Sequence, residues 1–150
     1  MLQLKRTNAA DRDFAEMVKA LDADLALRDG EEHAFYDQFN KLDSIKHVVI
    51  LYDAHEAVAC GALKKYDGTT VEVKRMYTSP ASRGRGFAGK ILEELELWAS
   101  KLLFDRCILE TGMKQPEAIG LYQKSGYRII PNYGQYIGKE NSICFEKKLK

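Results

Sequence analysis

Apolar and polar residues follow two different periods along the chain, and the change from one to the other marks its central stretch. From Val71 to Thr78 they alternate with a period of two, which predicts a β-strand. A glycine-containing loop follows, and apolar residues then recur at helical spacing, which predicts an amphipathic helix over 86–103. The apolar positions of this helix are Ala88, Ile91, Leu92, Leu95, Trp98, Ala99 and Leu102. A strand, a glycine loop and a helix N-terminus therefore follow one another over residues 71–92.

The same two periods predict the other elements of the chain. Asn8 or Asp11 caps a first helix with one apolar face, and Gly61 within a later strand predicts a β-bulge. Further helices are expected at residues 31–39 and 116–125, further strands at 2–6, 47–52, 57–65, 106–111, 127–130 and 142–149, and a glycine- and tyrosine-rich loop at 131–141. Helices that interrupt a mixed, mostly antiparallel sheet predict a single α/β (α+β) domain over 1–150.

Composition narrows the classes of function. The 150 residues suit one domain, and a net charge of +1 gives no general attraction to nucleic acid or to a membrane surface. Cys60, Cys107 and Cys144 are far apart and odd in number, so we expect buried free thiols in a reducing compartment. No cysteine or histidine spacing predicts a metal site, and no apolar run resembles a leader or a membrane span. These features predict a cytoplasmic protein without a metal.

The loop at residues 83–89, RGRGFAG, predicts a phosphate site. Glycines let backbone N–H groups approach an anion closely, and the dipole at the N-terminus of the following helix attracts negative charge. Two of the loop residues are arginines, which a turn that only caps a helix does not need.

Two general phosphate motifs fit this loop incompletely. Residues 84–89 match the dinucleotide pattern G-x-G-x-x-G, and Glu110 lies near the spacing of a ribose-binding acid. In that motif the first glycine directly follows the strand, whereas about six residues including Pro80 intervene here. The P-loop pattern needs a hydroxyl where this chain has Ile91, so we set it aside. The dinucleotide interpretation remains an alternative.

A third motif fits best. Arg83 to Ala88 matches R-x-x-G-x-A and resembles the pyrophosphate loop of the GNAT superfamily of N-acetyltransferases. The stretches EVKRMY at 72–77 and AIGLYQKSGY at 118–127 also resemble that family, and the resemblance runs from about residue 4 to residue 148. It implies a sheet of about seven strands flanked by about four helices. The strand before the loop and the strand after its helix would be parallel and splayed apart, with acetyl-CoA in the cleft between them.

The resemblance also implies which residues bind acetyl-CoA. The pyrophosphate would contact the loop, the pantetheine would pair with the strand before it, and the backbone N–H of Tyr77 would face the thioester carbonyl. The implied set is Met76, Tyr77, Thr78, Arg83, Gly84, Arg85, Gly86, Phe87, Ala88 and Gly89. The chain departs from the family at Gln115, where many members have an asparagine that contacts the cofactor, and Pro116 changes the helix start there.

Two residues are implied as catalytic. Tyr122 matches the family tyrosine near the CoA sulfur, where a phenol can protonate the leaving thiolate, although it could also be a packing residue. Glu72 matches a strand glutamate that serves as base, and Glu110 is the second candidate. The alternative for Glu72 is a surface glutamate paired with Lys74.

The acceptor is expected to be a small molecule with a primary amine. The balanced charge offers no acidic groove for a basic protein tail, while the helical pair near 28–39 and the loop 131–141 could close over a pocket. The residues expected around the acceptor are Arg28, Tyr36, Glu110, Tyr133 and Tyr136, with Arg28 as partner for a carboxylate. An amino acid or another amine with an acid group is therefore the leading class. A protein or peptide N-acetyltransferase and a catalytically silent CoA-binding module are the alternatives, and a homodimer is left open.

Overall fold

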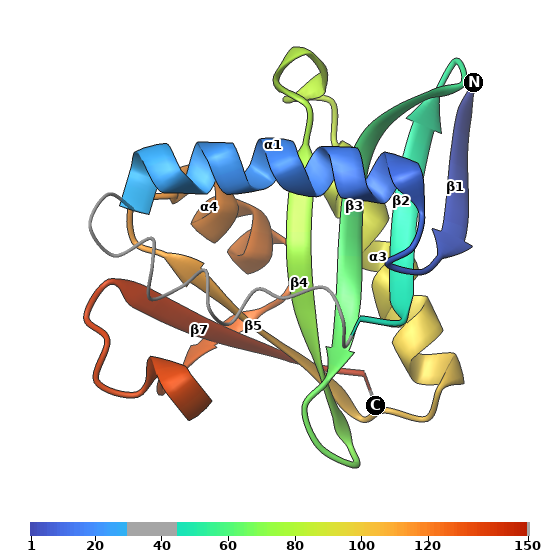
Figure 1. The fold of residues 1–150 in the computed structure, drawn as a ribbon. Helices are drawn as coiled ribbons and strands as arrows, with labels where there is room; N and C mark the ends of the chain where they lie inside the picture. The colour runs from blue at the N-terminus through green and yellow to red at the C-terminus, as the bar shows by residue number, and fades with distance from the viewer. Residues whose placement is uncertain (30–44, 150) are drawn as a thin grey trace.

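The computed structural model describes residues 1–29 and 45–149, which form one seven-stranded sheet with helices on both faces. The strand order is β1-β2-β3-β4-β5-β7-β6. The strands are β1 (Leu2–Thr7), β2 (His47–Asp53), β3 (Glu56–Lys65), β4 (Thr70–Thr78), β5 (Arg106–Gly112), β6 (Arg128–Ile130) and β7 (Ser142–Lys148). The described α-helices are α1 (Arg12–Asp29), α3 (Phe87–Lys101) and α4 (Pro116–Lys124). Figure 1 shows α1 across the front of the strands and α3 behind them.

The first helix begins where its cap is satisfied. Asp11 Oδ1 accepts hydrogen bonds from the backbone N–H groups of Asp13 at 2.9 Å and Phe14 at 3.4 Å, so Asp11 is the cap. Asn8 Oδ1 instead accepts a hydrogen bond from the backbone N–H of Ala10, which lies before the start of the helix. The buried face of α1 packs on the front of the sheet in a cluster of Phe14, Met17, Val18, Ile45, Val48, Ile50, Cys60 and Ala62.

The rear of the sheet packs against α3, and the side chains of α3 lie close to the backbone of Gly61. A Cβ at Gly61 would lie 2.6 Å from Met76 Sδ and 2.7 Å from Ile91 Cγ2. The pairing of β3 with β4 shifts register between Cys60 and Ala62, so the predicted bulge is present at the level of Gly61 but lies in the opposite strand. Two steps along β3 oppose three steps along β4, which means that β4 carries the extra residue.

The parallel pair at the centre of the sheet is short. β4 and β5 pair over three positions, from Thr70 opposite Arg106 to Glu72 opposite Ile108. Beyond these three positions β4 remains paired with β3, and β5 remains paired with β7. Among the described residues, no strand pairs with the facing edges of β4 and β5 past this point. The predicted fold class, the seven strands and the splayed parallel pair are therefore confirmed.

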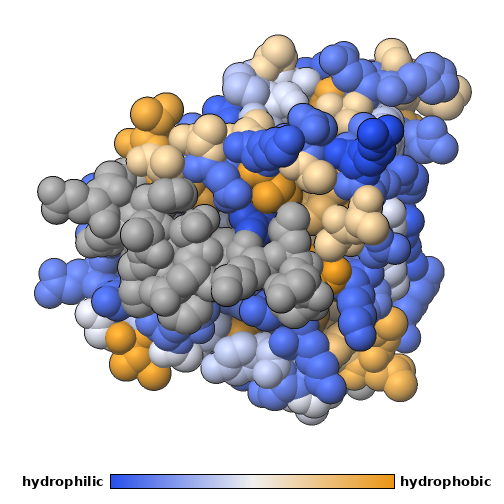
Figure 2. Space-filling view, in the orientation of Figure 1, coloured by the Kyte–Doolittle hydropathy of each residue, from blue (hydrophilic) through white to orange (hydrophobic). Residues whose placement is uncertain are grey.

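One expected helix cannot be compared. The structure describes three α-helices where about four were expected, and the helix predicted at 31–39 lies outside the described residues. None of the described helices is long and apolar enough to cross a membrane. On the face drawn in Figure 2, apolar surface occurs as several small patches with hydrophilic side chains between them.

Glu146 and the three cysteines are buried polar residues of the sheet. Glu146 on β7 receives hydrogen bonds from Arg106 on β5 and from Arg128 on β6, the latter at 2.7 Å, and these bonds hold the pKa of its carboxyl below the ordinary value. The three cysteines are free and buried, as predicted, and burial raises the pKa of Cys60 to about 12. Thiols with such a pKa stay protonated at neutral pH.

Candidate active site

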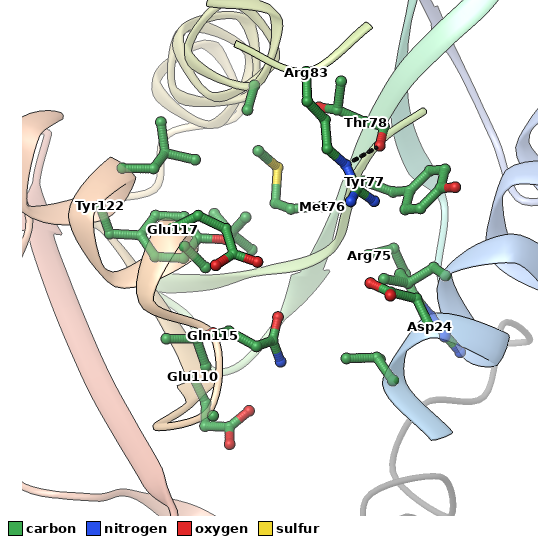
Figure 3. A pocket seen from close by; sticks show the side chains of 18 of the residues that line it. Asp24, Arg75, Met76, Tyr77, Thr78, Arg83, Glu110, Gln115, Glu117 and Tyr122 are labelled. Atoms are coloured by element: carbon green, nitrogen blue, oxygen red, sulfur yellow. Dashed lines mark hydrogen bonds between the residues drawn. The ribbon is translucent and has the colours of Figure 1, made fainter. Parts of the chain in front are cut away.

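A cleft of about 430 Å³ opens where β4 and β5 diverge. One wall is the end of β4 with the loop at 82–89, the opposite wall is the end of β5 with α4, and α1 contributes Leu21, Asp24 and Leu25. Figure 3 shows side chains from these elements directed into a common space. Nearly every residue that the sequence implied for cofactor and catalysis borders this space, so the fold brings distant parts of the chain together.

The glycine loop forms an open cradle at the N-terminus of α3. Gly84 and Gly86 adopt φ values of +80° and +78°, which residues with a side chain rarely adopt. A Cβ built at Gly84, Gly86 or Gly89 would meet nothing within 4 Å, so an approaching group has room there. The first N–H groups of an α-helix have no partner inside it, and Gly86 provides no side-chain cap. This cradle suits an anion.

The two arginines of the loop are placed differently. Arg83 borders the cleft, and its Nε donates to the carbonyl oxygen of Thr78 at 2.9 Å. Arg85 is not among the residues that border it; its Nη1 pairs with Asp53 Oδ2 at 3.1 Å, and its guanidinium lies over the ring of Phe87. Both side chains are exposed, but only Arg83 faces the space where phosphates are expected.

The end of β4 supplies a strand edge to the cleft. Met76, Tyr77 and Thr78 border the cleft on the side that β5 leaves when the two strands diverge. The opposite edge of this segment pairs with β3. An extended ligand with amide groups could therefore add to β4 where its neighbour strand ends.

Tyr122 on α4 lies on the wall opposite β4. Its side chain is 6% exposed, borders the cleft and packs against the rings of Tyr127 and Phe145. Burial raises the pKa of the phenol above its ordinary value, and the negative charge of Glu110 raises it further. Tyr122 is therefore a protonated donor beside the cleft.

The two candidate bases occupy different environments. Glu72 is 5% exposed, so the alternative is wrong in placing it at the surface, whereas the pairing with Lys74 that it included is present, with Lys74 Nζ 4.0 Å from Glu72 Oε2. Its Oε2 accepts a hydrogen bond from the Tyr133 hydroxyl at 2.6 Å, and it is not among the residues that border the cleft. Glu110, at the end of β5, does border it. Tyr133 belongs to the long loop after β6, and this loop covers Glu72. The burial of Glu72 thus depends on a distant segment and could not be predicted from the residues of β4.

Only some of the residues that were predicted to surround the acceptor border the cleft. Tyr136 borders the cleft, held there by a short 3-10 turn over Gly134–Tyr136. Tyr133 stacks edge-on against Tyr136, with ring centroids 5.7 Å apart. Arg28 belongs to α1, but its side chain lies outside the described set, and Tyr36 lies outside the described residues. Gln115, the departure from the family pattern, borders the cleft at the start of α4.

Two cations on β4 were not recognised as site residues from the sequence. Lys74 and Arg75 both border the cleft and both are buried. Lys74 Nζ donates to the Tyr136 hydroxyl at 3.3 Å and lies 4.0 Å from Glu72 Oε2, and burial lowers the pKa of its ammonium group. The alternating pattern of EVKRMY gave no sign that two consecutive charged residues would face one cleft.

Comparisons with known proteins agree with this geometry. The model of the acetyltransferase (GNAT) family matches residues 14–127. An IAA acetyltransferase from Azospirillum brasilense is 36% identical over 93 residues, 61% of each chain, and the uncharacterized N-acetyltransferase YsnE of Bacillus subtilis is 32% identical over 100 residues, 65% of this chain and 66% of that one. The matched stretch thus spans just under two thirds of the length of these relatives.

Solved structures extend the similarity to the whole chain. A Klebsiella pneumoniae protein, named for an expected acyl-CoA N-acyltransferase activity, is 28% identical, with a TM-score of 0.84 over 100% of this chain and 99% of that one. A GNAT family acetyltransferase from Elizabethkingia anophelis, solved with acetyl-CoA bound, has the same fold at 20% identity, with a TM-score of 0.72 over 98% of this chain and 97% of that one.

Proposed function

Because this chain belongs to the GNAT acetyltransferase family, we propose that it transfers the acetyl group of acetyl-CoA to the primary amine of a small molecule. The amine would attack directly, in a ternary complex of the enzyme with both substrates. The observation that carries this proposal is a single cleft that runs from the glycine cradle at α3 to Tyr122 and to the wall formed by α1.

The residues present fit acetyl-CoA. The cradle of Gly84 and Gly86 offers helix N–H groups to a pyrophosphate, with Arg83 beside it. The edge of Met76 to Thr78 offers backbone groups to the amides of a pantetheine arm. When bound there, acetyl-CoA supplies an activated thioester. The contacts implied for Arg85 and for the N–H of Tyr77 stay predictions.

Tyr122 is proposed as the proton donor. Its phenol is protonated at neutral pH, and its side chain borders the cleft. Such a group can protonate a departing thiolate.

For the base we favour Glu110 over Glu72. A general base must reach the proton of the amine, either directly or through one water molecule. Glu110 borders the cleft, whereas Glu72 is buried under Tyr133 outside it. Glu72 would then act indirectly, by holding Tyr133 and Lys74 in place.

A small acceptor fits the size of the cleft. Pockets of about 300–1,000 Å³ are typical of small-molecule sites, and this cleft of about 430 Å³ must also admit the thioester end of the cofactor. Tyr136 and Lys74 narrow its inner part. The cytoplasmic location and the homodimer left open by the sequence stay predictions.

A thiol-release assay with acetyl-CoA and a panel of amines tests the proposal. We expect release that depends on a small amine, together with a rise in melting temperature on adding acetyl-CoA. A thermal shift without amine-dependent release would support the silent CoA-binding module. Peptide acetylation with kcat/KM far above that of every small amine would support a protein acetyltransferase. A shift with NADH but none with acetyl-CoA would refute the assignment to acyl transfer.

A further inference from the structure

The loop between β6 and β7 is tied to β4 at two points. The Tyr133 hydroxyl donates a hydrogen bond to Glu72 Oε2 at 2.6 Å, and Lys74 Nζ donates to the Tyr136 hydroxyl at 3.3 Å. Glu72 and Lys74 are two positions apart on the strand, so both side chains leave it on the same face. Glu72, Lys74 and Tyr136 are buried. We call these four residues the β4–loop cluster.

The backbone of the loop is also held, from inside the loop itself. Asn132 Nδ2 donates to the backbone carbonyl oxygens of Tyr136 at 3.1 Å, Lys139 at 3.0 Å and Ser142 at 3.2 Å. The backbone N–H of Tyr136 donates to the carbonyl oxygen of Tyr133 at 3.0 Å, and the rings of these two tyrosines meet edge-on. Tyr136 is therefore held at its backbone, at its ring and at its hydroxyl.

The β4–loop cluster meets the cleft with only one of its sides. Lys74 and Tyr136 border the cleft, whereas Glu72 and Tyr133 are not among the described residues that do so. The ring of Tyr133 contacts Tyr136 and also Tyr66, whose ring centroid lies 5.3 Å away and whose side chain is exposed. Tyr136 is thus a wall of the cleft with packed side chains behind it.

This wall stands at the inner end of the cleft. The last paired position of β4 and β5 is Glu72 opposite Ile108, and Lys74 follows two residues later, where the strands begin to part. The glycine cradle lies beyond the other end of the open strand edge, after Thr78. Tyr136, in contact with Lys74, is therefore separated from the expected phosphate site by the strand edge that the pantetheine arm would cover.

We propose that Tyr136 is a specificity-determining residue that forms a fixed inner wall of the acceptor site and limits the length of the acceptor amine, and that Glu72 and Tyr133 are positioning residues that hold this wall. A buried polar network with its partners in place is rigid, and breaking it would leave the charges of Glu72 and Lys74 poorly paired. The wall therefore does not yield to a longer substrate. The inference rests on the acetyltransferase activity proposed above.

Amines of graded length test the inference. The acceptors are straight-chain amines, ω-amino acids and diamines, each series running from short to long, with acetyl-CoA saturating. In whichever series is acetylated, we expect kcat/KM of the wild type to fall sharply beyond a certain length. Tyr136→Ala should move this limit to longer acceptors and raise kcat/KM just beyond the wild-type limit by about ten- to a hundredfold. An unchanged limit would overturn the inference.

Two variants serve as controls for Tyr136→Ala. Tyr66→Ala removes an exposed ring behind Tyr133 and should keep the wild-type limit. If Tyr136→Ala does not fold, Tyr136→Leu keeps an apolar side chain there and should still move the limit toward longer acceptors; a limit equal to that of the wild type would overturn the inference. A large rise in the dissociation constant of acetyl-CoA in either Tyr136 variant would also overturn it, because Tyr136 would then line the cofactor site.

Variants of the rear pair separate positioning from proton transfer. Tyr133→Phe removes one hydroxyl and no charge, so it should raise KM for the acceptor about two- to tenfold, soften the length limit and leave kcat nearly unchanged. Glu72→Gln still offers an oxygen to the Tyr133 hydroxyl and should keep most of kcat, whereas Glu72→Ala should resemble Tyr133→Phe. If Glu72→Gln instead lowers kcat by a hundredfold or more while Tyr133→Phe has no effect, Glu72 is the base and the inference fails.

The thermal shift produced by acetyl-CoA shows whether each variant is folded and retains the cofactor site. If the wild type binds acetyl-CoA and acetylates no amine of any series, the proposed function itself is refuted. If it acetylates a series without any limit of length, the function stands and the assignment of Tyr136 is overturned.

Discussion

Gly61 gives the sharpest test of how the sheet and α3 fit together. In Gly61→Ala, the new methyl group would lie 2.6 Å from Met76 Sδ, 2.7 Å from Ile91 Cγ2 and 2.9 Å from Leu95 Cδ1. Ile91 and Leu95 are fully buried, so they have little room to withdraw. An extra methyl group in a packed core lowers the free energy of unfolding by about 1–3 kcal/mol. Replacing glycine by alanine also reduces the conformational entropy of the unfolded chain, which raises the free energy of unfolding by about 0.4–1 kcal/mol. We expect a net loss of about 1–2 kcal/mol in the free energy of unfolding.

Urea denaturation measures this loss, and Gly120 supplies a matched control. Gly120 lies in the middle of α4, is exposed, and a Cβ there would meet nothing within 4 Å. Gly120→Ala should therefore stabilise the protein by about 0.5–1 kcal/mol, because alanine is the better helix former. The reasoning would be refuted if Gly61→Ala were as stable as the wild type while Gly120→Ala showed its expected gain. Since Met76 borders the cleft, Gly61→Ala should also weaken acetyl-CoA binding, whereas Gly120→Ala should not.

Three other predictions follow from the site and from β7. Tyr122→Phe should lower kcat by about ten- to a thousandfold with little change in acetyl-CoA affinity, and an unchanged kcat in steady-state assays would mean that Tyr122 only packs. Arg83→Glu should raise the dissociation constant of acetyl-CoA, measured by calorimetry, far more than Lys90→Glu on the exposed face of α3; equal effects would place the phosphates elsewhere. Glu146, whose pKa its arginine partners lower, contributes stability above its unfolded pKa that is lost as the pH falls toward its folded value. Glu146→Gln should therefore show a smaller drop in urea midpoint between about pH 5 and pH 3 than the wild type, and an equal drop would contradict this assignment.

Local patterns in the sequence were sufficient for most of the fold. The period of two placed β4, the helical period placed α3, and the glycines and arginines of residues 83–89 indicated the anion cradle. These signals work because the spacing of apolar residues and the steric freedom of glycine act within a few residues.

The sequence was less informative wherever a distant segment decides the environment. Glu72 reads as the polar side of an alternating strand, but the loop after β6 brings Tyr133 over it and buries it. The bulge of β4 depends on the register between β3 and β4 and on the approach of α3 to Gly61. Register is set by pairing and packing, so it cannot be read from EVKRMY alone.

The divergence of β4 and β5 also bears on how the protein behaves in solution. Exposed strand edges promote aggregation, and natural sheets usually cover or disrupt them. Here two such edges lie at the centre of the sheet, facing each other across the cleft, and each is available to any extended chain that enters. Acetyl-CoA would cover the β4 edge in the way that a neighbouring strand would cover it. The yield and shelf life of the purified protein should therefore depend on the cofactor, and light scattering at rising concentration should show slower association when acetyl-CoA is present.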